Sequence, residues 1–185
     1  VRILEELGCE GIRLEEGIGI DAPNTWWTEF YGGISTRLSG AMRDSRDLLD
    51  PALCEVLEAA GGQSFSSYYE NVFARYAFRE KVSALFESFD LLLSPTVPIA
   101  ACDVGVDVPT QFGGRSLCTW QYYTYPFNVT GQPAASVPVG FTAAGLPVGL
   151  QMVAKVNQEK DIFRAASALE GEQCLWDTVP PGFAQ

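Results

Sequence analysis

The sequence predicts an α/β fold, and three observations support this expectation. Leu91, Leu92 and Leu93 belong to an apolar run between Asp90 and Pro95, which is typical of a strand buried on both faces. Residues 134–139 and 147–153 are short apolar segments interrupted by Gly and Pro, which favours two further strands. Apolar residues at helical spacing occur before and after these segments, so we expect helices beside a sheet.

The first half of the chain predicts mainly helices. Residues 1–7 form an opening helix that ends at Gly8, and the alternation in 11–15 favours a short strand. Asn24 can cap a helix over 25–43, whose apolar stripe consists of Trp26, Trp27, Phe30, Ile34 and Leu38. Asp50 and Pro51 begin a short helix that ends at 61–62.

Two longer helical patterns complete the expected elements. Ser67 and Glu70 have the spacing of a capping box, which predicts a helix from there to about 89. A last helix is expected from 157 or 158 to 170, with one buried face made of Ile162, Phe163, Ala166 and Leu169. Between the helical regions, 95–118 is irregular, and we expect a loop or lid there. Residues 172–185 are expected to form a tail.

Composition narrows the functional classes. The chain has 185 residues, of which 47% are hydrophobic and 19% are charged, as in an ordinary globular protein. Its formal net charge of -11 disfavours binding to nucleic acid or to an anionic membrane. The sequence has no apolar run of about 18 residues and no secretory leader pattern, so we expect a cytoplasmic location.

The reactive residue types exclude several mechanisms. The five cysteines contain no CxxC pair, which argues against a disulfide framework or a zinc site. The chain has no histidine, so it cannot use a Ser-His-Asp or Cys-His mechanism by itself. We therefore predict no metal and no cofactor. Hydrolysis by carboxylates of this chain is weakly supported, because no close acidic pair lies in its aromatic segment.

Residues 119–151 have the composition of a cleft wall. Five aromatic residues precede Asn128 and the turn signal at 131–133, and the two predicted strands follow. The aromatic residues are Trp120, Tyr122, Tyr123, Tyr125 and Phe127. An aromatic cluster can equally be part of the core, and the residues alone leave both interpretations open.

The segments PFNVTGQPAASVPVGF and GLPVGLQMVA resemble the C-terminal part of the amidase signature enzymes. FESFDLLLSPTVP and ILEELGCEG extend the resemblance more loosely over nearly the whole chain. The family consists of serine-dependent hydrolases of carboxamides, and includes the amidotransferase subunit that frees ammonia from glutamine. The resemblance implies that this chain contributes part of a mixed central sheet flanked by helices.

The resemblance also implies that this chain holds no catalytic residue. The family uses a serine nucleophile, a second serine in a cis peptide and a lysine, within a Gly/Ser-rich stretch. Lys81, Lys155 and Lys160 have no such surroundings. We therefore expect 1–185 to be a single C-terminal segment or subunit, inactive alone. The nucleophile would lie on an N-terminal amidase segment before Val1 or on a companion chain.

Within the aromatic segment, the resemblance implies substrate contacts. Trp120, Tyr123 and Phe127 can bury an apolar acyl group, at about 25 cal/mol per Å² removed from water. Gln121, Thr124 and Asn128 can supply hydrogen bonds that orient the substrate.

A neutral or apolar amide is the expected substrate. Family members that use glutamine carry an aspartate where this chain has Gln121, and an upstream arginine that holds the α-carboxylate. This chain has no Lys or Arg between Arg46 and Arg75. A fragment of an amidotransferase A-type subunit, and a non-catalytic binding or scaffold module, remain the alternatives. A homo-oligomer is a further open expectation.

Overall fold

The computed structural model describes residues 1–14, 17–18, 23–105, 111–112, 115–116 and 122–179. They form two compact units, one made of 1–17 and 83–185 and the other of 18–82. The prediction that 1–185 are one C-terminal segment concerns the whole protein and stays a prediction.

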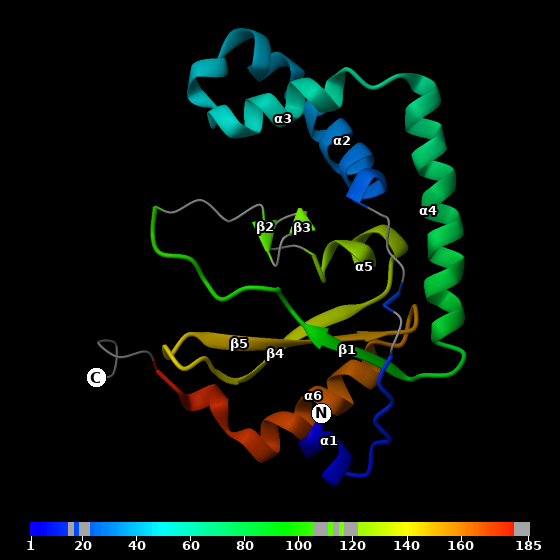
Figure 1. The fold of residues 1–185 in the computed structure, drawn as a ribbon, viewed down its shortest axis with the longest axis vertical. Coiled ribbons are helices and arrows are strands. Elements are labelled where there is room, and N and C mark those ends of the chain that lie inside the picture. Colours follow the sequence, from blue (N-terminus) through cyan, green and yellow to red (C-terminus); the bar gives the residue numbers. More distant parts are fainter. Residues whose placement is uncertain (15–16, 19–22, 106–110, 113–114, 117–121, 180–185) are drawn as a thin grey trace. The chain divides into compact units, whose positions relative to one another are not determined.

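The first unit is built on a three-stranded sheet (Figure 1). Its strands are β1 (Leu91–Pro95), β4 (Ala134–Phe141) and β5 (Pro147–Ala154), in the order β1-β5-β4, and both pairings are antiparallel. The predicted α/β fold with a sheet flanked by helices is confirmed. The expectation that β1 is buried on both faces is wrong, because four of its residues are only half-buried and Pro95 is exposed.

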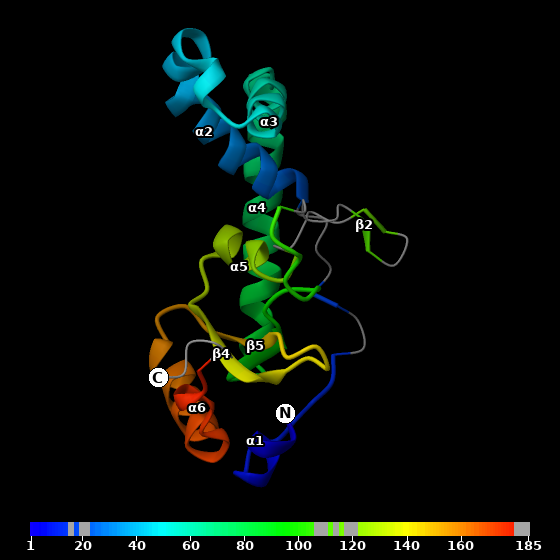
Figure 2. The same cartoon turned by 90° about the vertical axis from the view of Figure 1, so that its left-hand side faces the viewer.

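One face of this sheet carries the core. Its apolar residues pack against α6 (Glu159–Gln173) and α1 (Arg2–Glu6), which lie on the same side of the sheet in both views (Figures 1 and 2). Ile162 and Leu169 of α6 are buried there, but Phe163 is 71% exposed, so the prediction that it belongs to the buried face is wrong. The buried members of this core are Leu4, Val137, Met152, Ala154, Ile162 and Leu169.

The other face of the sheet carries α5 (Tyr125–Thr130) (Figure 1), which the sequence did not predict. Within the predicted loop 95–118, β2 (Gln111–Phe112) and β3 (Arg115–Ser116) pair in antiparallel register. The predicted tail contains a 3-10 helix, Leu175–Asp177. Residues 11–14 have no regular structure, so the predicted strand over 11–15 is wrong there, and 15 lies outside the described residues.

The second unit contains α2 (Pro23–Asp44), a 3-10 helix (Arg46–Leu48), α3 (Pro51–Gly61) and most of α4 (Phe65–Leu85). Asp50 caps α3 as predicted, since its Oδ1 accepts the Leu53 N–H at 2.9 Å. The predicted capping box of Ser67 and Glu70 is wrong. Ser64 Oγ accepts the Ser67 N–H at 3.0 Å, and α4 begins two residues before Ser67.

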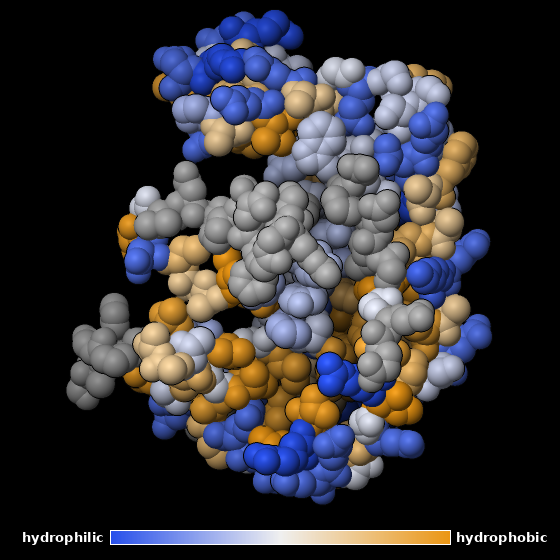
Figure 3. Space-filling model, in the orientation of Figure 1, coloured by the Kyte–Doolittle hydropathy of each residue, from blue (hydrophilic) through white to orange (hydrophobic). Residues whose placement is uncertain are grey.

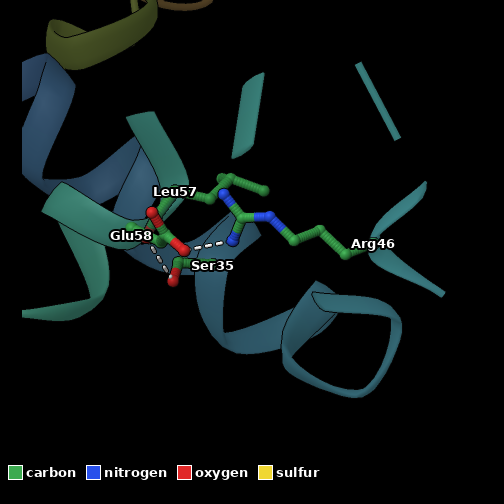
Figure 4. A network of polar contacts seen from close by, with 4 residues as sticks. All are labelled: Ser35, Arg46, Leu57 and Glu58. Carbon is green, nitrogen blue, oxygen red and sulfur yellow. Dashed lines mark hydrogen bonds and ion pairs between the residues drawn. The ribbon is translucent and has the colours of Figure 1, made fainter. Parts of the chain in front are cut away.

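Polar contacts join α2, α3 and the 3-10 helix between them (Figure 4). Ser35 Oγ donates to the Leu57 carbonyl at 2.8 Å, and Arg46 pairs with Glu58. The hydrogen bond and charge of Arg46 lower the pKa of the Glu58 carboxyl, and Glu58 raises the pKa of Arg46. Among the described helices, none combines the length and apolarity needed to cross a membrane.

Candidate functional site

A row of polar side chains crosses the sheet on the face that carries α5. The register places Gln151 of β5 directly opposite Ser94 of β1 and Ser136 of β4. Because side chains alternate between the faces of a strand, all three lie on the side opposite the apolar core. Gln151 Nε2 donates to Ser94 Oγ at 3.0 Å and to the Tyr123 carbonyl at 2.8 Å, so both of its hydrogens are used.

A pair of hydroxyl groups meets over the central strand beside this row. Thr96 Oγ1, just after the end of β1, and Ser136 Oγ of β4 lie 2.7 Å apart, although β5 separates β1 from β4. Gly149 on β5 makes this contact possible. A Cβ at that position would lie 2.6 Å from Ser136 Oγ and 2.8 Å from Thr96 Oγ1.

These groups line a cavity of about 280 Å³, which we call the polar pocket. Its described wall contains hydroxyl and amide side chains together with one aromatic ring, and none of the described lining residues is ionisable. The pocket is therefore suited to an uncharged ligand that makes hydrogen bonds. The lining residues are Thr96, Thr124, Phe127, Asn128, Gln132, Ala134, Ala135, Ser136 and Gln151.

Three of the six predicted substrate contacts line the polar pocket. Phe127 is 5% exposed, and Asn128 Nδ2 donates to the Thr124 carbonyl at 3.2 Å. Tyr123 contributes its backbone carbonyl to Gln151, and its ring packs edge-on against Tyr122. Trp120 and Gln121 lie outside the described residues. A role in substrate binding stays a prediction for all six.

Four other polar residues of the pocket were not predicted as site residues: Thr96, Gln132, Ser136 and Gln151. The sequence held a signal for three of them. Thr96, Ser136 and Gln151 are polar residues in or beside otherwise apolar strand segments, a pattern that indicates a polar sheet face. The cross-strand register that joins them could not be obtained from spacing alone.

The end of α5 positions Gln132. Gly131 takes a left-handed conformation (φ 82°), and its N–H donates to the Phe127 carbonyl at 2.8 Å, which closes the helix. Thr130 Oγ1 donates to the Pro126 carbonyl at 3.0 Å and also contacts Gln132 Oε1. Gln132 is 7% exposed, and its Nε2 has no partner among the described residues.

A second hollow of about 500 Å³ lies along β1. Its lining combines apolar residues with the charged Glu5, Glu10 and Arg13, and Figure 3 shows apolar side chains gathered on the visible face of this unit. In the described part of the chain β1 pairs only with β5, so its other edge is open. The hollow is lined by Val1, Glu5, Glu10, Gly11, Ile12, Arg13, Leu14, Phe89, Leu91, Leu92 and Leu93.

The chain is similar in sequence to known proteins. A family model described as Amidase matches residues 42–163, well over half of the chain. Over 121 residues the chain is 39% identical to the A-type subunit of the glutamyl-tRNA(Gln) amidotransferase of Myxococcus xanthus. This match covers 63% of the chain and 24% of the relative, so the chain spans about a quarter of that protein.

Solved structures show the same fold. A structure described as an amidase superposes with a TM-score of 0.83 at 21% identity, over 93% of this chain and 40% of the other. A bacterial aryl acylamidase of the amidase signature enzymes gives a TM-score of 0.79 at 24% identity, over 92% of this chain and 38% of the other. The expected likeness to a portion of the amidase signature fold is confirmed. The chain belongs to the amidase signature family.

Proposed function

We propose that this chain forms the substrate-binding wall and part of the scaffold of an amide hydrolase that acts on neutral or apolar carboxamides. The observation that carries the proposal is the polar pocket, which gathers Thr124, Phe127 and Asn128 and has no ionisable side chain among its described lining residues. A neutral amide needs hydrogen bonds and apolar contact, and no charge partner. Products would be a carboxylate and ammonia or an amine.

The reactive groups are proposed to lie on other polypeptide. No Gly/Ser-rich stretch with a preceding lysine occurs in the 185 residues, and the chain matches only 24% of an amidotransferase relative and 40% of an amidase structure. We call the polypeptide that carries the Ser-Ser-Lys groups the companion segment. The edge of β1 that is unpaired among the described residues, and the hollow with apolar residues beside it, support docking of this segment. We expect the contact to exceed about 2,000 Å², as in obligate complexes.

A glutamine-dependent amidotransferase subunit is the second candidate function. It is favoured by the 39% identity to the A-type subunit of a glutamyl-tRNA(Gln) amidotransferase. Against it, Gln121 replaces the family's aspartate, and no Lys or Arg lies between Arg46 and Arg75. An unpaired α-ammonium or α-carboxylate in the cleft would cost roughly 2–5 kcal/mol each.

Reconstitution tests the proposal. The chain is mixed with a companion segment from a homologous amidase, and ammonia release from benzamide and from glutamine is measured. We expect hydrolysis of benzamide only when both polypeptides are present. The matched control carries alanine in place of the companion's serine nucleophile and should be inactive.

The other outcomes separate the alternatives. Faster hydrolysis of glutamine than of benzamide would favour the amidotransferase. A stable complex that hydrolyses neither compound would favour a binding or scaffold module. Hydrolysis of benzamide by this chain alone would contradict the proposal that the catalytic groups lie on the companion segment.

A further inference from the structure

We infer that the hydroxyl pair of Thr96 and Ser136 is the hydrogen-bond donor on the sheet side of the polar pocket, and that it binds a neutral oxygen of the ligand. The identification of the ligand as a carboxamide rests on the proposed function, but the presence of this donor does not. Both residues line the pocket, and their side-chain oxygens lie 2.7 Å apart. The pair is accessible, because Ser136 is exposed and Thr96 is half-buried.

The hydrogen atoms of the pair show that one donor is unused. Each hydroxyl carries one hydrogen, and the bond between the two oxygens uses one of the two. Among the described residues, neither hydroxyl makes a further hydrogen bond. The second hydrogen is therefore available to a ligand. Gln151 cannot take this role, since both of its amide hydrogens already have acceptors.

The sheet holds this donor in place. The Thr96 N–H donates to the Gly149 carbonyl at 2.9 Å, and Ser136 pairs with Gln151 in the register of β4 and β5. Gly149 has no Cβ, so the two hydroxyl groups meet directly over β5. A donor that is already oriented loses little conformational entropy when a ligand binds.

A neutral oxygen is the ligand atom that fits the pair best. A hydroxyl that accepts a hydrogen bond becomes a stronger donor, and a donor left without a partner costs more than an unused lone pair. A carboxylate oxygen is disfavoured, because no described lining residue carries a positive charge and the chain has a formal net charge of -11. The oxygen need not belong to the carbonyl that is hydrolysed, because the oxyanion donors are proposed to lie on the companion segment.

Exchange of oxygen for sulfur in the ligand isolates the contribution of this hydrogen bond. Benzamide and thiobenzamide have the same arrangement of atoms, but sulfur is a weak acceptor. The hydroxyl pair should therefore favour benzamide. Because thiobenzamide is also the more apolar compound, the informative quantity is the ratio of the two affinities, compared between the wild-type chain and a variant without the hydroxyls.

Equilibrium binding to the isolated 185-residue chain measures this ratio without catalysis. Benzamide and thiobenzamide are titrated separately, and affinity is followed by ligand-observed saturation-transfer NMR. Thr96→Val combined with Ser136→Ala removes both hydroxyls and keeps the shape of the threonine side chain. We expect the affinity for benzamide to fall about fivefold in this double variant and the affinity for thiobenzamide to stay nearly unchanged.

Ser94→Ala is the matched control. Ser94 also carries a hydroxyl on this face of the sheet, but it does not line the polar pocket. This variant should keep the wild-type ratio of affinities. Ser136→Ala alone changes one exposed residue and removes the bond that orients the Thr96 hydroxyl, so it should lower the ratio as well. The test therefore remains decisive if the double variant fails to fold.

Two results would overturn the inference. One is an equal ratio of affinities in the wild-type chain and the double variant, or in the wild-type chain and Ser136→Ala where the double variant does not fold. The other is no detectable binding of benzamide to the wild-type chain. If either occurs while the reconstituted enzyme hydrolyses benzamide, the proposed function stands and the role of the hydroxyl pair falls. If the ratio depends on the pair and reconstitution gives no hydrolysis, the reverse holds.

Discussion

Gly149 has no Cβ, which leaves room for the hydroxyl groups of Thr96 and Ser136 to form a hydrogen bond across β5. Gly149→Ala would place a Cβ within 2.8 Å of both Thr96 Oγ1 and Ser136 Oγ. One hydroxyl must move, and their hydrogen bond is lost. We expect the free energy of unfolding to fall by about 1–2 kcal/mol, measured by urea denaturation.

Two variants control this measurement. Gly171→Ala lies in α6 of the same unit, where a Cβ would meet nothing within 4 Å, and it should stabilise the protein slightly. Ser136→Ala removes the nearer oxygen, so Gly149→Ala should cost less in that background. An equal cost in both backgrounds would show that the hydroxyl pair is not what excludes alanine.

Individual side chains show where sequence periodicity reaches its limit. Ile162, Phe163, Ala166 and Leu169 were predicted to share one buried face, yet Phe163 is 71% exposed. In α6 adjacent residues point about 100° apart, so Ile162 and Phe163 cannot both face the centre of a narrow contact. Periodicity predicts which side of a helix is buried. How many positions around the helix are buried depends on the element that packs against it, which periodicity does not reveal.

At the level of elements, Gln151 links β5 to β1 and to the segment that leads into α5. Its amide hydrogens reach Ser94 Oγ and the Tyr123 carbonyl, and the residue is 3% exposed. Gln151→Leu should therefore lower the free energy of unfolding by about 1–3 kcal/mol, because both acceptors lose their partner. Hydrogen exchange should also become faster at the start of α5.

Ser94→Ala separates the two contacts of Gln151. It removes only the bond to β1, so it should cost less stability than Gln151→Leu and leave exchange in α5 unchanged. Faster exchange in α5 of Ser94→Ala, or unchanged exchange in Gln151→Leu, would contradict an anchoring role of Gln151.

The strands were predicted more accurately than the connections between them. Residues 134–139 and 147–153 matched β4 and β5 within a few residues, since apolar segments bounded by Gly and Pro are a strong local signal. The six-residue helix α5 was missed because it is shorter than two turns and contains Pro126. Its Tyr125 and Phe127 are buried, so its formation depends on tertiary packing.

At the level of the whole molecule, the polar pocket could be predicted only in part. Its Thr124, Phe127 and Asn128 are neighbours in sequence, so a composition argument could find them. Thr96 and Gln151 join them through the β1-β5-β4 order, which pairs residues more than 50 positions apart. Strand register depends on such long-range contacts, and a single sequence does not specify them directly.

The open edge of β1 gives a test of assembly with the companion segment. Thr96 N–H donates to the Gly149 carbonyl at 2.9 Å, so with antiparallel pairing the Leu92 amide also faces β5. The amides of Leu91 and Leu93 then face the open edge. We expect both to exchange rapidly with deuterium in the isolated chain and to become protected when the companion segment binds, because docking extends the sheet. Leu92 is the internal control and should be protected in both states. Binding of the companion segment without new protection at Leu91 and Leu93 would show that it docks elsewhere.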